Sequence, residues 1–103
     1  MADVTYTRPP IPAGYQQVSA GPNTVGTLTI PTDSRYAIIK VVSAAGNYRD
    51  DGTSPASASG GGYPLAVGDI ITLMSAEQLV AFEFICTGDD ETVLEVLYYK
   101  ISV

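Results

Sequence analysis

Residues 35–43 read RYAIIKVVS, and this stretch indicates the fold class more strongly than any other part of the chain. Ala37, Ile39 and Val41 recur with period two, which places their side chains on one face of an extended strand. The residues between them are also largely apolar. This pattern predicts a β-strand that is covered on both faces.

Strand patterns recur on both sides of this stretch, each bounded by Gly, Pro, Asp or Asn. We expect further strands at residues 3–7, 15–20, 25–30, 70–74, 79–86 and 92–101. Leu28 and Ile30 should point inward, and residues 87–91 should join the last two strands as a hairpin. A single helical turn is expected at residues 75–78. The prediction is an all-β fold, a small β-sandwich or barrel of six to eight mostly antiparallel strands.

Residues 8–14, RPPIPAG, carry three prolines, which fix φ and remove backbone donors. Such a segment is excluded from a central strand and is typical of an extended, polyproline-like arm. We therefore divide the chain into an N-terminal arm at residues 1–14 and a single β domain at residues 15–103. A segment with preset φ loses little entropy on docking, although it would also serve as a surface linker. The predicted partner-binding residues of the arm are Arg8, Pro9, Pro10, Ile11 and Pro12.

Composition narrows the classes of partner. The chain has 103 residues, enough for one domain, with 46% hydrophobic and 16% charged residues and a net charge of −6. Its five basic residues are scattered, whereas phosphate backbones and anionic membranes attract clustered Lys and Arg. No apolar run approaches the length of a membrane span and no leader peptide is evident. We expect no nucleic-acid partner, no membrane partner and synthesis in a reducing cytosol.

The residue types used most often in catalysis are scarce. The chain has no histidine and one cysteine, which removes the commonest general base and the usual zinc sites. Asp50 with Asp51, and residues 89–91, lack the spacing of a calcium loop and are typical of turns. The glycines at 60–62 are not followed by the Lys-Ser/Thr of a phosphate loop. Cys86 is expected to be a buried small hydrophobe. We predict a chain that is not an enzyme and has no catalytic, cofactor or metal site.

Three motifs resemble a group of small tailed-bacteriophage virion proteins. They are IPTDSRYA at residues 30–37, YRDDGTSP at 48–55 and YPLAVGD at 63–69. The likeness covers about residues 25–101, and the Ser/Gly segment before Tyr63 is longer than in that group. The resemblance implies a capsid decoration or cement protein, located in the virion after synthesis in the bacterial host cytoplasm. It also implies many-copy binding to the major capsid protein or other virion proteins, a homo-oligomer and no catalysis.

The aromatic-Arg-Asp-Asp-Gly-Thr turn also has a physical interpretation. Arg49 next to two aspartates favours a local charge-assisted hydrogen bond, and Gly52 would supply a positive φ. The predicted partner-binding residues outside the arm are Tyr48, Arg49 and Tyr63. The alternative function is a carbohydrate- or receptor-binding β-sandwich of a phage tail or fibre. In that case Tyr48 and Tyr63 would line one exposed groove, because aromatic rings serve as platforms for sugars.

Overall fold

Strands dominate the protein, which we describe from a computed structural model covering residues 10–58 and 60–101. The strands and the one helix of these ranges are β1 (Pro10–Ala20), β2 (Gly26–Thr27), β3 (Tyr36–Ser43), β4 (Gly46–Arg49), β5 (Tyr63–Leu65), β6 (Ile70–Leu73), α1 (Ala76–Ala81), β7 (Glu83–Cys86) and β8 (Thr92–Ile101). The predicted all-β class is confirmed.

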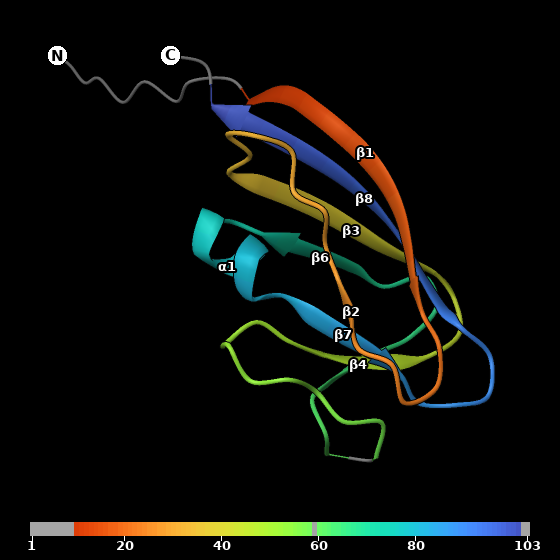
Figure 1. The fold of residues 1–103 in the computed structure, drawn as a ribbon. Helices are drawn as coiled ribbons and strands as arrows, with labels where there is room; N and C mark the ends of the chain where they lie inside the picture. Colours follow the sequence, from red (N-terminus) through yellow and green to blue (C-terminus); the bar gives the residue numbers. More distant parts are fainter. Residues whose placement is uncertain (1–9, 59, 102–103) are drawn as a thin grey trace, which may run out of the picture.

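The strands form two antiparallel sheets of four strands each (Figure 1). The first sheet has the order β1-β8-β3-β6, and the second has the order β2-β7-β4-β5. The long, curved β1 and β8 lie side by side in the first sheet, and the green loop after β4 projects from the second (Figure 1). Of the two architectures that the sequence left open, this arrangement is the β-sandwich.

The core lies between the sheets and follows the predicted alternation. Ala37, Ile39 and Val41 of β3 are buried, as are Leu94, Val96 and Tyr98 of β8. The opposite face of β3 differs from the prediction, because Ile38 and Lys40 are exposed in the described chain. Ile38 is apolar enough to be covered, but no element of the described chain lies over this face. One side of the first sheet is therefore an open, partly apolar face.

The stretch at residues 79–86 begins as a helix, not as the predicted strand. Helix α1 starts after Ser75, whose hydroxyl accepts a hydrogen bond from the Gln78 amide (3.2 Å). This N-cap satisfies a free backbone donor and favours a helical start over the strand alternation. Leu79 is buried while Val80 is exposed, and only Glu83–Cys86 forms a strand.

The last two strands do not form the predicted hairpin. Strand β7 pairs with β2 and β4 in the second sheet, whereas β8 pairs with β1 and β3 in the first. Residues 87–91 therefore cross from one sheet to the other. The buried Thr92 hydroxyl anchors the crossing by donating to the carbonyl of Ala45 (2.8 Å). Turn residues indicate a reversal of the chain but not whether it stays in one sheet.

The predicted boundary of the N-terminal arm is also corrected. Residues 10–14 begin β1 and pair with the end of β8, from Pro10 opposite Ile101 to Gly14 opposite Tyr98. The register shifts between Pro12 and Gly14, and β1 is an edge strand. Edges and bulges are the sheet positions where proline is tolerated, so extended geometry and strand pairing are compatible here. Arg8, Pro9 and the strand expected at residues 3–7 lie outside the described residues.

The connection between β2 and β3 is hydrogen-bonded to β1. Strand β2 has only two residues, but Leu28 and Ile30 pack against the core as predicted. The side-chain oxygen of Gln16 accepts from the Thr29 amide (3.1 Å) and from the buried Tyr98 hydroxyl (2.6 Å). Burial raises the pKa of Tyr98 to about 12. This bonding ties β1, β8 and the connection after β2 together.

Candidate functional site

Two neighbouring strands of the second sheet bring Tyr48 and Tyr63 together. The two residues are directly opposite each other in the β4–β5 pair, with ring centroids 5.6 Å apart and planes inclined by 51°. Tyr63 is 68% exposed and Tyr48 is half-buried. We call these two tyrosines together with Pro64 the tyrosine ridge. It stands at the edge of the second sheet, because β5 is the last strand in that sheet.

The ridge rests on rings from the core. The Tyr48 ring lies 5.3 Å from that of Phe82, which lies 6.0 Å from that of Phe84. Both phenylalanines are fully buried. Tilted aromatic contacts at these distances are favourable beyond the area they bury. Tyr63 is thus the exposed end of a column of rings that begins in the core, which limits its freedom to move.

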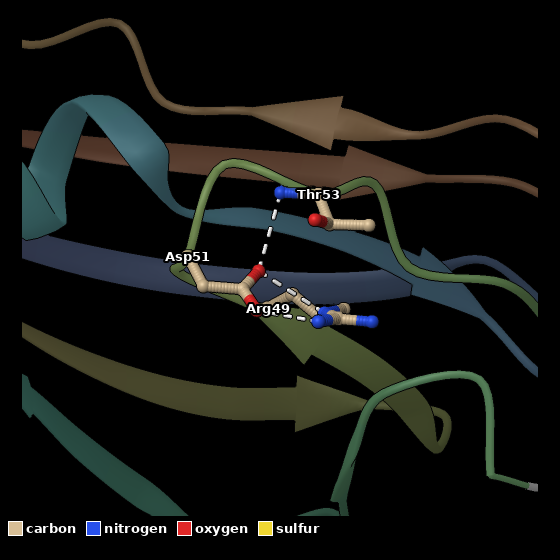
Figure 2. Close-up of polar contacts among 3 residues, drawn as sticks. All are labelled: Arg49, Asp51 and Thr53. Carbon is tan, nitrogen blue, oxygen red and sulfur yellow. Dashed lines mark hydrogen bonds and ion pairs between the residues drawn. The ribbon is translucent and has the colours of Figure 1, made fainter.

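Arg49 and Asp51 shape the turn that leaves β4 (Figure 2). The Arg49 guanidinium pairs with both carboxylate oxygens of Asp51, with Nε 3.1 Å from Oδ1, and Asp51 also accepts from the Thr53 amide (3.2 Å). The hydrogen bond from Arg49 is the largest influence that holds the pKa of Asp51 below its usual value. Gly52 has φ +86°. The predicted local bond and positive φ are confirmed.

Buried Asn47 holds the loop at residues 53–62 against the second sheet. Its side-chain amide donates to the carbonyls of Ala56 (2.9 Å) and Ala58 (3.1 Å). Gly62 runs so close to β4 that an added Cβ would lie 2.9 Å from the Tyr48 carbonyl oxygen. A glycine is required for this approach. Sequence analysis missed Asn47, since an asparagine beside glycine is also the usual mark of an exposed turn.

Two open hollows share the ridge as a wall. The first, of about 410 Å³, is bordered by the turn and the glycine loop; its lining residues beyond the ridge are Arg49, Asp50, Asp51, Gly60 and Gly62. The second, of about 320 Å³, lies between the edge strands β5 and β6 and adds Leu65, Asp69, Ile70 and Ile71 to the ridge. The structure therefore brings the predicted Tyr48, Arg49 and Tyr63 to one place.

Besides Asp51, two acidic side chains lie beside the ridge, Asp50 and Asp69, and both accept hydrogen bonds from neutral donors. Gln78 of α1 donates to Asp50 (3.2 Å), and the Ala66 amide donates to Asp69 (2.8 Å). Burial, followed by the nearby Asp50 and Tyr63, raises the pKa of the Tyr48 hydroxyl, which therefore remains a neutral donor at ordinary pH. Within the described residues, no three acidic or cysteine side chains gather closely enough to hold a metal ion.

A second surface lies on the outer face of the first sheet. Side chains that are paired across antiparallel strands point to the same face. Tyr15, Leu97, Ile38 and Thr72 form one such row across β1, β8, β3 and β6. The exposed fractions of the first three are 59%, 45% and 39%.

The apolar surface continues beyond this row. Ile101 is exposed at the end of β8. In the adjoining row Tyr36 lies opposite Tyr99, and these two tyrosines are half-buried. The exposed residues Tyr15, Ile38, Leu97 and Ile101 are called the outer patch. The alternation of β3 was visible in the sequence, but this face of the strand was predicted to be covered and is exposed in the described chain.

The predicted binding residues of the arm that the structure describes do not join the tyrosine ridge. Ile11 and Pro12 lie in β1 of the first sheet, opposite Lys100 and Tyr99, whereas the ridge belongs to the second sheet. Cys86 is buried, as predicted, and its thiol faces the carbonyls of Gly88 and Asp90.

Comparison with protein-family models, with curated proteins and with solved structures gave no match to this chain. Among the helical residues of the described chain, no segment has the length and apolar character needed to cross a membrane.

Proposed function

We propose that this chain is a non-catalytic structural protein of a tailed-phage virion, of the capsid-decoration type, and that the outer patch docks on the major capsid protein. The observation that carries the docking proposal is the uncovered apolar row on the first sheet. Contiguous exposed apolar surface on a small domain is typical of a surface that is covered by another protein.

The surroundings of the outer patch suit a protein partner. The row crosses neighbouring β-strands, and it contains Tyr15 with aliphatic Leu97 and Ile38. Aromatic residues are enriched at protein–protein interfaces, where they bury a large area at a small entropy cost. Lys40 and Glu95 lie opposite each other in the next row and give the patch a polar border on that side, as at the rim of a protein–protein interface.

The phage setting is supported by the resemblance of residues 30–69 to small virion proteins. In that stretch the YRDDGTSP motif has a structural role, because Arg49 pairs with Asp51 and Asp51 accepts a hydrogen bond from the Thr53 amide of the turn. The proposal places the working surface on the opposite sheet from the motif.

Quantitative mass spectrometry of purified phage particles tests the proposal, with this chain measured against the major capsid protein. The proposal requires a copy number in the hundreds that follows the capsid lattice. A handful of copies would assign the chain to the tail or neck, and complete absence would remove it from the virion. Sedimentation of the purified chain measures its oligomeric state. A stable oligomer that buries Tyr15 would assign the outer patch to a second copy of this chain instead.

A further inference from the structure

We infer that the tyrosine ridge is a second binding site, independent of the outer patch, and that it takes a neutral oligosaccharide lying across both hollows. Tyr63 is the most direct indication, because this residue is 68% exposed while its ring packs against that of Tyr48. Tyr48, Tyr63 and Pro64 line both hollows, so a ligand reaching from one to the other crosses the ridge.

The chemistry of the hollows selects a polyhydroxylated ligand. Their lining combines aromatic and proline surface with carboxylate oxygens from Asp50 and Asp69. Sugar rings have one apolar face that packs on an aromatic ring and hydroxyl groups around the edge that donate to carboxylates. A chain of sugars therefore matches a ridge with an acceptor in the hollow on each side.

Charge argues against an acidic ligand. Arg49 is the basic residue that lines the first hollow, and both of its bonded nitrogens are already directed at Asp51. Asp50 and Asp69 add negative charge to the two hollows, and the whole chain has a net charge of −6. An anionic polysaccharide or a phosphate would meet repulsion here.

The backbone argues against an extended peptide. Peptides commonly bind by adding a strand to an open sheet edge, and β5 is the edge of the second sheet. Pro64, at the middle of this three-residue strand, has no N–H to donate. A short edge that contains proline is a poor template for a further strand. The edge therefore favours a ligand that does not need backbone pairing, such as a neutral oligosaccharide.

The site is also preorganised. The ring column fixes Tyr63 from below, Asn47 fixes the loop, and the Arg49–Asp51 pair fixes the turn. Groups that are held before binding lose little entropy when the ligand arrives.

The test is a titration of the full ¹⁵N-labelled chain with maltohexaose, chitohexaose and mannohexaose, followed by amide NMR shifts. At least one sugar is expected to shift amides at residues 48–51 and 60–65 and to saturate at up to about 10 mM. Tyr63→Ala should weaken that binding by about tenfold or more, equal to about 1.4 kcal/mol. Tyr63→Phe keeps the ring and should stay within about threefold of the parent chain.

Val80→Ala is the control, because this exposed side chain lies on α1 and lines neither hollow. It should leave sugar binding unchanged. The inference is overturned if none of the three sugars shifts the ridge amides at about 10 mM, or if Tyr63→Ala binds as well as the parent. A Val-Thr repeat decapeptide is titrated in parallel. If it shifts the β5 amides while the sugars do not, the ridge is a peptide site.

Discussion

Tyr15 on the outer patch and Tyr63 on the tyrosine ridge are exposed to a similar extent, 59% and 68%, but their surroundings are opposite in kind. Tyr15 lies in a row of side chains across regular strands, where the strand register brings apolar residues together. Tyr63 stands above two hollows formed by loops and strand edges, with carboxylates beside it. An apolar strip on a sheet face suits a protein surface, and a hollowed ridge suits a small or chain-like ligand.

The two regions also depend on the core differently. The outer patch needs only that β1, β8 and β3 keep their register, because each side chain points away from the core. The ridge needs individual core contacts, from Phe82 to Tyr48 and from Asn47 to the loop. Core substitutions should therefore affect the ridge before they affect the patch. The following predictions separate the two.

Phe82→Ala should have the largest effect on stability. Phe82 is fully buried inside the ring column, between Phe84 and Tyr48, and truncating a core phenylalanine costs about 3–5 kcal/mol through lost burial and a cavity. Urea unfolding measures this loss. Val80→Ala, which changes an exposed residue nearby on α1, should stay within about 0.5 kcal/mol of the parent chain. Equal effects of the two substitutions would contradict the burial described for Phe82.

Leu97→Lys should remove partner binding without unfolding the chain. Leu97 is at the centre of the outer patch, and a charge there would be buried against the partner at a cost of about 2–4 kcal/mol. The measurement is the copy number of the variant in phage particles, relative to the parent chain. Val80→Lys is the matched control, since it also puts a lysine at an exposed apolar position but outside the patch. Full incorporation of Leu97→Lys would show that the patch is not the docking surface.

High pH should weaken the first sheet through Tyr98. Its pKa is about 12 when folded and about 10 when unfolded, so the folded chain holds the proton more tightly between these values. The stabilisation is complete below about pH 10 and is lost as the pH rises toward 12, a decrease of about 2–3 kcal/mol.

The measurement is the urea midpoint across this pH range, compared with Tyr98→Phe. Tyr98→Phe has no hydroxyl to titrate, so its stability should fall less steeply than that of the parent chain. The Gln16 side chain would keep its bond from the Thr29 amide in the variant, which limits the structural change. Identical slopes in the two proteins would assign the alkaline loss to other groups.

Asn47→Ala should have a smaller and more local effect. It removes two hydrogen bonds to loop carbonyls from a buried position, which costs about 1–3 kcal/mol. Amide hydrogen exchange should accelerate at Ala56 and Gly61, whose amides bond within the loop. Exchange in β8 should accelerate less. Uniform acceleration through both sheets would mean that the loop does not depend on Asn47 alone.

The alternating apolar residues were sufficient to predict the fold class and the buried faces of β3 and β8. The same alternation did not reveal that residues 79–81 are helical, because an N-cap serine competes locally with strand formation. It also did not show that residues 87–91 cross between sheets, since a turn sequence sets the reversal but not the partner strand. The prolines indicated an edge or extended position for residues 10–14, but not their pairing with β8.

The candidate site was predictable in part. Tyr48, Arg49 and Tyr63 were selected by aromatic character and motif, and the β4–β5 pairing brings them together. Asn47 and Phe82 support the same site but lie in unremarkable sequence, and Asp69 lines it although the YPLAVGD motif gave no reason to select this residue. Their contributions depend on contacts across elements, which a pattern along one chain does not contain. The outer patch was hidden for the same reason, because exposure is decided by what covers a strand.

The central claim is that the outer patch is covered by protein in the virion while the ridge stays open. Tyrosine nitration, with sites located by mass spectrometry, tests it on the free chain and on purified phage particles. Tyr15 and Tyr63 should both react in the free chain, in keeping with their exposure. In particles we predict that Tyr15 is protected and Tyr63 still reacts. Equal reactivity of Tyr15 in both samples, or protection of Tyr63 alone, would contradict the account.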